Sequence, residues 1–208
     1  MRRSWHFVVL ALLLVVLVLA GPAATWLQAR QSWCDKGDAV DVLYVMDGAD
    51  IALRVGGIVS WIMAGGSVRV ILIPRSDMQG AWSLDDGRRL TVTEWTKKML
   101  RDQFRAAGTS SEDEGVDVRV VSVRLDGTRA ELASLDWGSV KDVGSIVAVA
   151  TARHHIRRAL YHTRHRLSPV RRLVAIPASP SWKDRAPWVV TVELLKLARD
   201  TIAFRAAE

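Results

Sequence analysis

Residues 145–150 (SIVAVA) form an uninterrupted apolar run, and Thr151 and a helical pattern follow it directly. A strand that is apolar on both faces is typical of the centre of a parallel sheet, where helices cover both sides. Further short β-branched runs have the same character, so each of them is predicted to be a strand. They span residues 41–46, 68–73, 117–123 and 171–176.

Longer segments with helical spacing separate these predicted strands. Strands that alternate with helices indicate right-handed crossovers and a parallel sheet covered on both faces. The sequence therefore predicts a three-layer α/β sandwich with a mainly parallel sheet of about five strands. Two polar stretches, 75–89 and 109–115, are predicted to be loops. The expected helices span residues 51–64, 91–107, 128–137, 153–167 and 188–205.

Composition limits the class of protein. The 208 residues are 50% apolar and 25% charged, which suits one globular domain and excludes a mainly disordered chain. The single cysteine, Cys34, excludes an internal disulfide framework and a cysteine-based zinc site. A formal net charge of +7 favours anionic partners such as lipid headgroups, phosphates or nucleic acid.

The amino-terminal segment has the pattern of a membrane helix. Residues 7–20 contain no polar side chain, and the wider apolar stretch from Trp5 to Leu27 would span roughly 34 Å as a helix. Arg2 and Arg3 precede the stretch, so the positive-inside rule places the amino terminus in the cytoplasm. We therefore expect a single-pass protein of the bacterial inner membrane with its domain on the extracytoplasmic side.

A cleaved signal peptide is the competing interpretation, because small residues occupy positions 21–24 after the apolar run. Length and the tryptophans at both ends favour the uncleaved anchor. The expected organisation is a transmembrane anchor over 1–30, a linker over 31–40 and an α/β domain over 41–208.

Ligands of open α/β sheets bind beyond the carboxyl ends of the strands. After the first strand come Asp47, Gly48 and Asp50, and the next helix carries Arg54. Gly48 permits a tight turn, and the helix terminus can hold an anion. Asp47 and Asp50 could bind a divalent cation, but a helix cap is the commoner role of an aspartate here. No sequence pattern of a dinucleotide site or P-loop is present.

The helix after residues 145–150 carries four of the five histidines. At 100° per residue, His155, Arg158 and His162 share one arc of this helix with His165 and Arg166. The first turn places Arg158, which can hold a phosphate, and His155, which can transfer a proton, near the sheet edge. A solvated basic face is the simpler alternative. The histidine spacing does not suggest a metal site.

The order of these motifs resembles the YdcF, ElyC and SanA family, also called domain of unknown function 218, over roughly residues 40–205. The resemblance is specific at a T-S-x-x-H-x-x-R-A signature, on which Thr151, His155, Arg158 and Ala159 fall. Ala152 replaces the usual serine. Weaker matches are the strand and turn 41–48, Arg54, Glu94, the segment 127–131 with Glu131, and Glu193 with Lys196.

This resemblance implies a Rossmann-like fold, membrane anchoring and a role in the cell envelope. It also implies, for some members, a nucleotide-like ligand such as S-adenosylmethionine. Here the usual glycine cluster is reduced to Gly48, so we expect no cofactor.

With the resemblance included, the expected site has His155 and Glu131 as catalytic residues. His155 would transfer a proton, and Glu131 would orient His155. Gly48, Arg54, Thr151 and Arg158 are the expected substrate-binding residues, and Arg158 with Arg54 would hold the phosphate of an envelope precursor such as a lipid-linked sugar.

Simpler interpretations remain for three charged residues that the resemblance includes. Glu131 could form a capping box with Thr128, Arg54 could pair with Asp50, and Glu94 could stabilise its own helix dipole. The expected partners are the membrane, an anionic small molecule or lipid-linked phosphate, and a membrane protein, but not nucleic acid. The other hypothesis is a non-catalytic anchored protein that docks an acidic partner or lipid through its basic helix, so catalysis itself stays open.

Overall fold

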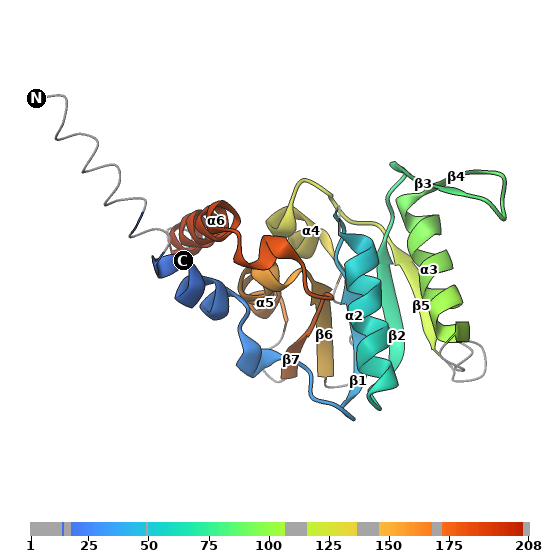
Figure 1. Ribbon diagram of the computed structural model, residues 1–208, viewed down its shortest axis with the longest axis horizontal. Coiled ribbons are helices and arrows are strands. Elements are labelled where there is room, and N and C mark those ends of the chain that lie inside the picture. The colour runs from blue at the N-terminus through green and yellow to red at the C-terminus, as the bar shows by residue number, and fades with distance from the viewer. Residues whose placement is uncertain are drawn as a thin grey trace, which may run out of the picture.

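The computed structural model describes residue 14 and residues 18–48, 50–106, 116–136, 146–167 and 172–205. Within these residues, five parallel strands form one sheet in the order β5-β2-β1-β6-β7 (Figure 1). The predicted α/β fold with a parallel sheet of this size is confirmed, and it is Rossmann-like. The strands are β1 (Ala39–Val45), β2 (Ser67–Pro74), β5 (Asp117–Val121), β6 (Ile146–Thr151) and β7 (Arg172–Pro177).

Alternate side chains of the central strands serve two separate cores. In β6, Ala148 and Ala150 contribute to the core on one face, and Val147 and Val149 contribute to the core on the other. Successive strand residues point to opposite faces, so a strand covered on both sides must be apolar throughout. This geometry explains why residues 146–150 have only apolar side chains.

Helices cover both faces of the sheet (Figure 1). The first core includes side chains of α2 (Ile51–Met63) and α3 (Val92–Ala106). The second includes side chains of α4 (Thr128–Ser134) and α5 (Ile156–Arg164). The short 3-10 helix η3 (Arg153–His155) leads into α5, and η4 (Trp182–Arg185) precedes the final helix α6 (Pro187–Arg205).

The strand order places a crevice between β1 and β6. The chain moves outward from β1 through β2 to β5 on one side, and from β6 to β7 on the other. Connections at the carboxyl ends of β1 and β6 therefore diverge to opposite faces. Open α/β sheets bind ligands at such a switch point, so this edge is where a site is expected.

The predicted loop over 75–89 is wrong in part, because it contains an antiparallel hairpin. Strands β3 (Gln79–Ser83) and β4 (Arg88–Thr91) form a second sheet beside α3 (Figure 1). Most of their side chains are exposed, so the hairpin lacks the apolar alternation by which a half-buried strand is recognised. The other predicted loop, 109–115, lies outside the described residues.

Most of the predicted transmembrane anchor also lies outside the described residues. Residues 18–27 are helical, and no helix within the part of the chain described here is long and apolar enough to cross a membrane. Ala24 and Leu27 pack against Val190 and Leu197 of α6. In the predicted linker 31–40, Trp33 forms a β-bridge with Ala175 of β7, so this segment lies against the sheet.

Candidate functional site

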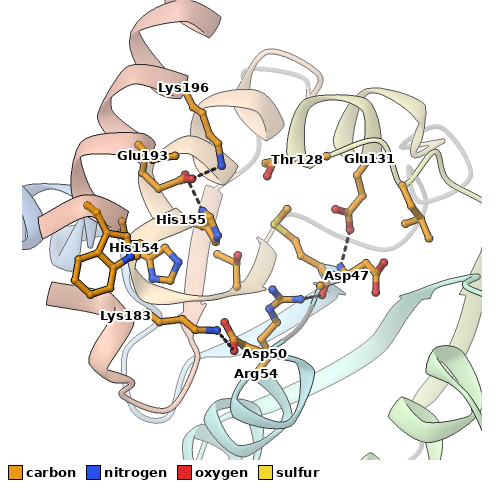
Figure 2. Close-up of a pocket in the computed structure, with 18 residues that line it drawn as sticks. Asp47, Asp50, Arg54, Thr128, Glu131, His154, His155, Lys183, Glu193 and Lys196 are labelled. Atoms are coloured by element: carbon orange, nitrogen blue, oxygen red, sulfur yellow. Dashed lines mark hydrogen bonds and ion pairs between the residues drawn. The ribbon is translucent and has the colours of Figure 1, made fainter. Parts of the chain in front are cut away.

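A pocket of about 450 Å³ lies at the carboxyl ends of β1 and β6 (Figure 2). Five of the six residues expected to form a site line it, from the turn after β1, from α2, from α4 and from the segment after β6. They are Gly48, Arg54, Glu131, Thr151 and His155. The opposite wall comes from η4 and α6 and adds charged groups of both signs, namely Lys183, Glu193 and Lys196.

The turn after β1 brings its backbone against Arg54. Gly48 has φ of 132°, a conformation that favours glycine. A Cβ at this position would lie 2.8 Å from Nη2 of Arg54, so a side chain would displace the guanidinium. The structure thus gives Gly48 a specific role, which is to permit both the turn and the close approach of Arg54.

Arg54 is a buried cation without a carboxylate partner among the described residues. Its side chain is 4% exposed, its Nη1 donates a hydrogen bond to the main-chain oxygen of Met46, and its Nε has no hydrogen-bond partner. Burial lowers the pKa of the guanidinium, and the nearby charges of Glu131, Asp50 and Asp47 partly oppose this effect. Since none of these carboxylates forms an ion pair with Arg54 and its Nε lacks a hydrogen-bond partner, the buried guanidinium can still receive an acceptor.

Glu131 accepts hydrogen bonds from two groups of β1 and its turn. The hydroxyl of Tyr44 and the backbone N–H of Asp47 both donate to Oε1, at 2.7 and 2.8 Å. Burial raises the pKa of Glu131, although these hydrogen bonds and Arg54 oppose the effect. Thr128 does not cap α4, because the N-cap is Gly127 and no side chain caps it, so Glu131 does not form the capping box considered from the sequence.

His155 lies on the opposite side of the pocket from Glu131 and contacts Glu193 (Figure 2). Its Nδ1 is 2.7 Å from Oε2 of Glu193, and 27% of its side chain is exposed. Burial lowers the pKa of His155, so the ring is neutral at pH 7. A carboxylate beside Nδ1 favours the tautomer that carries its proton on Nδ1, in which Nε2 is the acceptor. The residue that orients His155 is therefore Glu193, and the expectation that Glu131 does so is wrong.

Glu193 stays ionised although its side chain is only 2% exposed. Burial by itself would raise its pKa, but His155, Lys196 and Arg158 outweigh burial and lower the pKa to about 2. Lys196 donates a hydrogen bond to Oε1 at 2.9 Å. Glu193 thus joins α6 to the first turn after β6.

Arg158 is placed differently from the expectation. It does not line the pocket, and its guanidinium lies between α5 and α6, where Nη1 donates to Glu193 and Nε is 3.3 Å from Asp200. His162, one turn further along, contacts the same Asp200 at 2.8 Å. Carboxylates of α6 thus pair with the basic side chains along two turns of α5. The remaining members of the predicted basic arc, His165 and Arg166, lie just after α5 and are exposed. Arg158 does not line the pocket, so its guanidinium is not placed to hold a phosphate there.

Lys183 forms an ion pair with Asp50, with Nζ 2.9 Å from Oδ1 (Figure 2). Asp50 precedes α2 but its side chain makes no capping hydrogen bond. Of the roles considered from the sequence, Asp50 therefore neither caps the helix nor pairs with Arg54, and it pairs with Lys183 instead. His154 similarly contacts Asp184 at 2.9 Å. No group of three or more potential metal ligands occurs among the residues with a described structure.

Glu94 lies outside this pocket and stabilises the start of α3. Its carboxylate accepts a hydrogen bond from the backbone N–H of Thr91, and the Thr91 hydroxyl accepts one from the N–H of Glu94. Arg88 pairs with the same carboxylate. These bonds form a reciprocal cap, so the simpler interpretation of Glu94 agrees with its geometry.

Three charged side chains of the site were not among the site residues predicted from the sequence. Glu193 and Lys196 were matched only by the family resemblance, and Lys183 was not singled out. Their signal was weak because α6 lies about forty residues after β6, and nothing local shows which strand edge the helix covers. One available clue was that Glu193 and Asp200, seven residues apart, share a face of an otherwise apolar and basic helix.

No protein-family model matches this sequence, and no curated protein matches it at a significant level. Among solved structures, the chain is similar to a protein of the universal stress protein family from Burkholderia pseudomallei. The two share 15% sequence identity with a TM-score of 0.36, over 70% of this chain and 99% of that one. What the pocket binds must therefore be argued from its own residues.

Proposed function

We propose that this chain is a YdcF-like protein of the bacterial cell envelope, which binds and processes a phosphate-bearing envelope precursor in the pocket between β1 and β6. The observation that carries the proposal is the buried guanidinium of Arg54. The carboxylates of Asp50 and Glu193 have cationic partners, whereas no described residue forms an ion pair with Arg54. A bound phosphate would form the ion pair that these carboxylates do not form and would accept a hydrogen bond from Nε, which has no partner.

The same pocket is suited to acid–base chemistry. His155 is neutral and oriented by Glu193, so its Nε2 can take a proton from an attacking water or hydroxyl. On the other wall, burial raises the pKa of Glu131 above its usual value, and its Oε1 accepts hydrogen bonds from the Tyr44 hydroxyl and the N–H of Asp47. These bonds hold its carboxylate at the pocket, across from His155. This arrangement supports transfer or hydrolysis at the phosphate.

The alternative function, docking through a basic helix, has less support. Arg158 and His162, the centre of the expected cationic face, are buried against Glu193 and Asp200 of α6. A docking surface needs exposed charges, and α5 retains few of them.

Membrane anchoring belongs to the same proposal and is supported by the sequence. The apolar stretch from Trp5 to Leu27 has the length of a bilayer core, and Arg2 and Arg3 favour a cytoplasmic amino terminus. The domain would then face the envelope, where lipid-linked phosphates are the anionic partners and nucleic acid is absent.

Calorimetric titration of inorganic pyrophosphate into the full chain in detergent micelles tests this function. Arg54→Lys keeps a positive charge but loses the planar fork, so we expect affinity to fall about ten- to a hundredfold. The matched control is Arg69→Lys, at an exposed position near the amino end of β2. Equal affinity of wild type and Arg54→Lys, or an equal loss in Arg69→Lys, would reject an anion site at Arg54.

A further inference from the structure

The outer face of α6 is apolar although it is exposed. Trp188, Val192, Leu195 and Ile202 are 61%, 44%, 66% and 69% exposed. Their spacing of three, four and seven residues places them on one side of the helix. A helix that covers a soluble domain normally shows polar residues on this side, so the stripe needs a partner.

The charges of α6 are distributed in a way that identifies the partner. Its two acidic side chains, Glu193 and Asp200, are 2% and 0% exposed and point toward α5. The charged side chains that remain accessible are basic, Lys196 and Arg199, which are 40% and 68% exposed and pair with Glu193 and Asp200. At 100° per residue Arg199 lies within the stripe, between Leu195 and Ile202, and Lys196 lies beside it. An exposed apolar face whose accessible charges are all cationic is typical of a helix that lies in an anionic membrane interface.

The stripe borders the pocket. Trp188 and Val192 also line the pocket, so the apolar face reaches its rim. On the opposite side of α6, about half a turn from the stripe, Val190 and Leu197 pack against the end of the helix over 18–27 (Figure 1). Trp182 and Trp188, both largely exposed, form a ring pair at the start of the stripe. Exposed tryptophans are favoured at the level of lipid headgroups.

We propose that the face of α6 formed by Trp188, Val192, Leu195 and Ile202 lies in the interface of an anionic bilayer, so that the pocket opens at the membrane surface. The ligand is then an amphiphile, with its phosphate at Arg54 and its apolar chain passing Trp188 and Val192 into the lipid. The identity of the ligand rests on the proposed function, whereas the seating of α6 in the membrane does not.

Depth-dependent fluorescence quenching tests the seating of α6. The full chain with Cys34→Ser is reconstituted into vesicles of phosphatidylglycerol and phosphatidylcholine, and Leu195→Cys carries a fluorophore. Lipids with a nitroxide on the acyl chain should quench this label by roughly half, since interfacial helices bury their apolar face about 5–10 Å deep. The control is Leu84→Cys, which lies between β3 and β4 and is 89% exposed. We expect no quenching there.

Equal quenching at both positions, or none at Leu195→Cys, would overturn the proposal. A label at Leu195→Cys that escapes lipid quenching, but shifts its emission to the blue as protein concentration rises, would show instead that α6 is an interface between copies of this chain or with another protein.

The ligand class is tested with farnesyl pyrophosphate and inorganic pyrophosphate as probes. In the same vesicles, we expect the farnesyl compound to bind at least about tenfold more tightly, because its chain is buried. Leu195→Asp with Ile202→Asp should abolish this advantage and leave pyrophosphate binding unchanged, since neither residue lines the pocket. Equal affinity of the two probes for the wild type would overturn the proposal that the ligand is an amphiphile. If the wild type failed to bind pyrophosphate but the label at Leu195→Cys was still quenched, the proposed function would be rejected and the seating of α6 in the membrane would stand.

Discussion

His155 and Arg158 are three residues apart, yet they have different environments. His155 reaches the pocket wall, whereas Arg158 is buried behind it and contacts Glu193 and Asp200. Both contact Glu193, so this carboxylate determines the orientation of His155 and the position of Arg158 together. Conversely, Arg54 is buried but directed at the pocket, which makes it the cation best placed for an anion.

At the residue scale, Glu193→Gln should change the protonation of His155. Burial lowers the pKa of His155, and Glu193 opposes that effect, so removing the anion should lower the pKa further. Nitrogen-detected NMR of the imidazole across pH measures this shift and should show the Nδ1–H tautomer in the wild type. Asp184→Asn is the matched control, because Asp184 contacts His154 instead. An unchanged or raised pKa of His155 in Glu193→Gln would contradict the assigned pair.

At the scale of elements, α5 and α6 are joined by a buried network of charges. Arg158 and His162 of α5 face Glu193 and Asp200 of α6, and all four side chains are buried. A pair of this kind adds little net stability when it is complete, but removing one member leaves a buried charge unpaired. The network therefore fixes how α6 sits against α5, and so which wall of the pocket it forms.

This network predicts a loss of stability in acid. The pKa values of Glu193 and Asp200 are lower in the folded protein than in the unfolded chain, so their contribution is complete above about pH 4.5 and is lost as pH falls. The contribution of Glu193 is lost as pH falls through its folded pKa of about 2. Asp200→Asn should lower the free energy of unfolding by about 3 kcal/mol at pH 7 and flatten this acid dependence. Urea unfolding at a series of pH values measures both effects.

The control for that experiment is Asp102→Asn, which removes an exposed partner of Lys98 on α3. Exposed pairs contribute little, so its unfolding curve should match the wild type at every pH. If Asp200→Asn retained the full acid dependence, the buried network would not be its source.

At the scale of the whole molecule, the sequence predicts that the domain faces outward from the bacterial inner membrane. Protease added to intact spheroplasts should degrade the domain and leave a small membrane-bound fragment, because Arg2 and Arg3 predict a cytoplasmic amino terminus by the positive-inside rule. A cytoplasmic protein that stays intact in the same sample is the control. A domain protected in intact spheroplasts would contradict this topology.

The sequence by itself determined the elements of the fold and much of the pocket. All five strands of the parallel sheet and all five predicted helices correspond to elements of the structure, because apolar periodicity reflects burial that is imposed locally. Gly48, Thr151 and His155 lie at or just beyond the carboxyl ends of strands, positions that meet at one edge of an open α/β sheet, and the resemblance to the family signature also selected Thr151 and His155.

Only the tertiary structure decided which polar groups face each other. The helical arc of α5 showed that Arg158 and His162 share a side, but a polar side can face water or another helix with matching charges. That choice depends on where α6 packs, about forty residues later in the chain, and the periodicity of neither helix encodes it. The partner of His155, the burial of Arg158 and the unpaired state of Arg54 are all consequences of packing between distant segments.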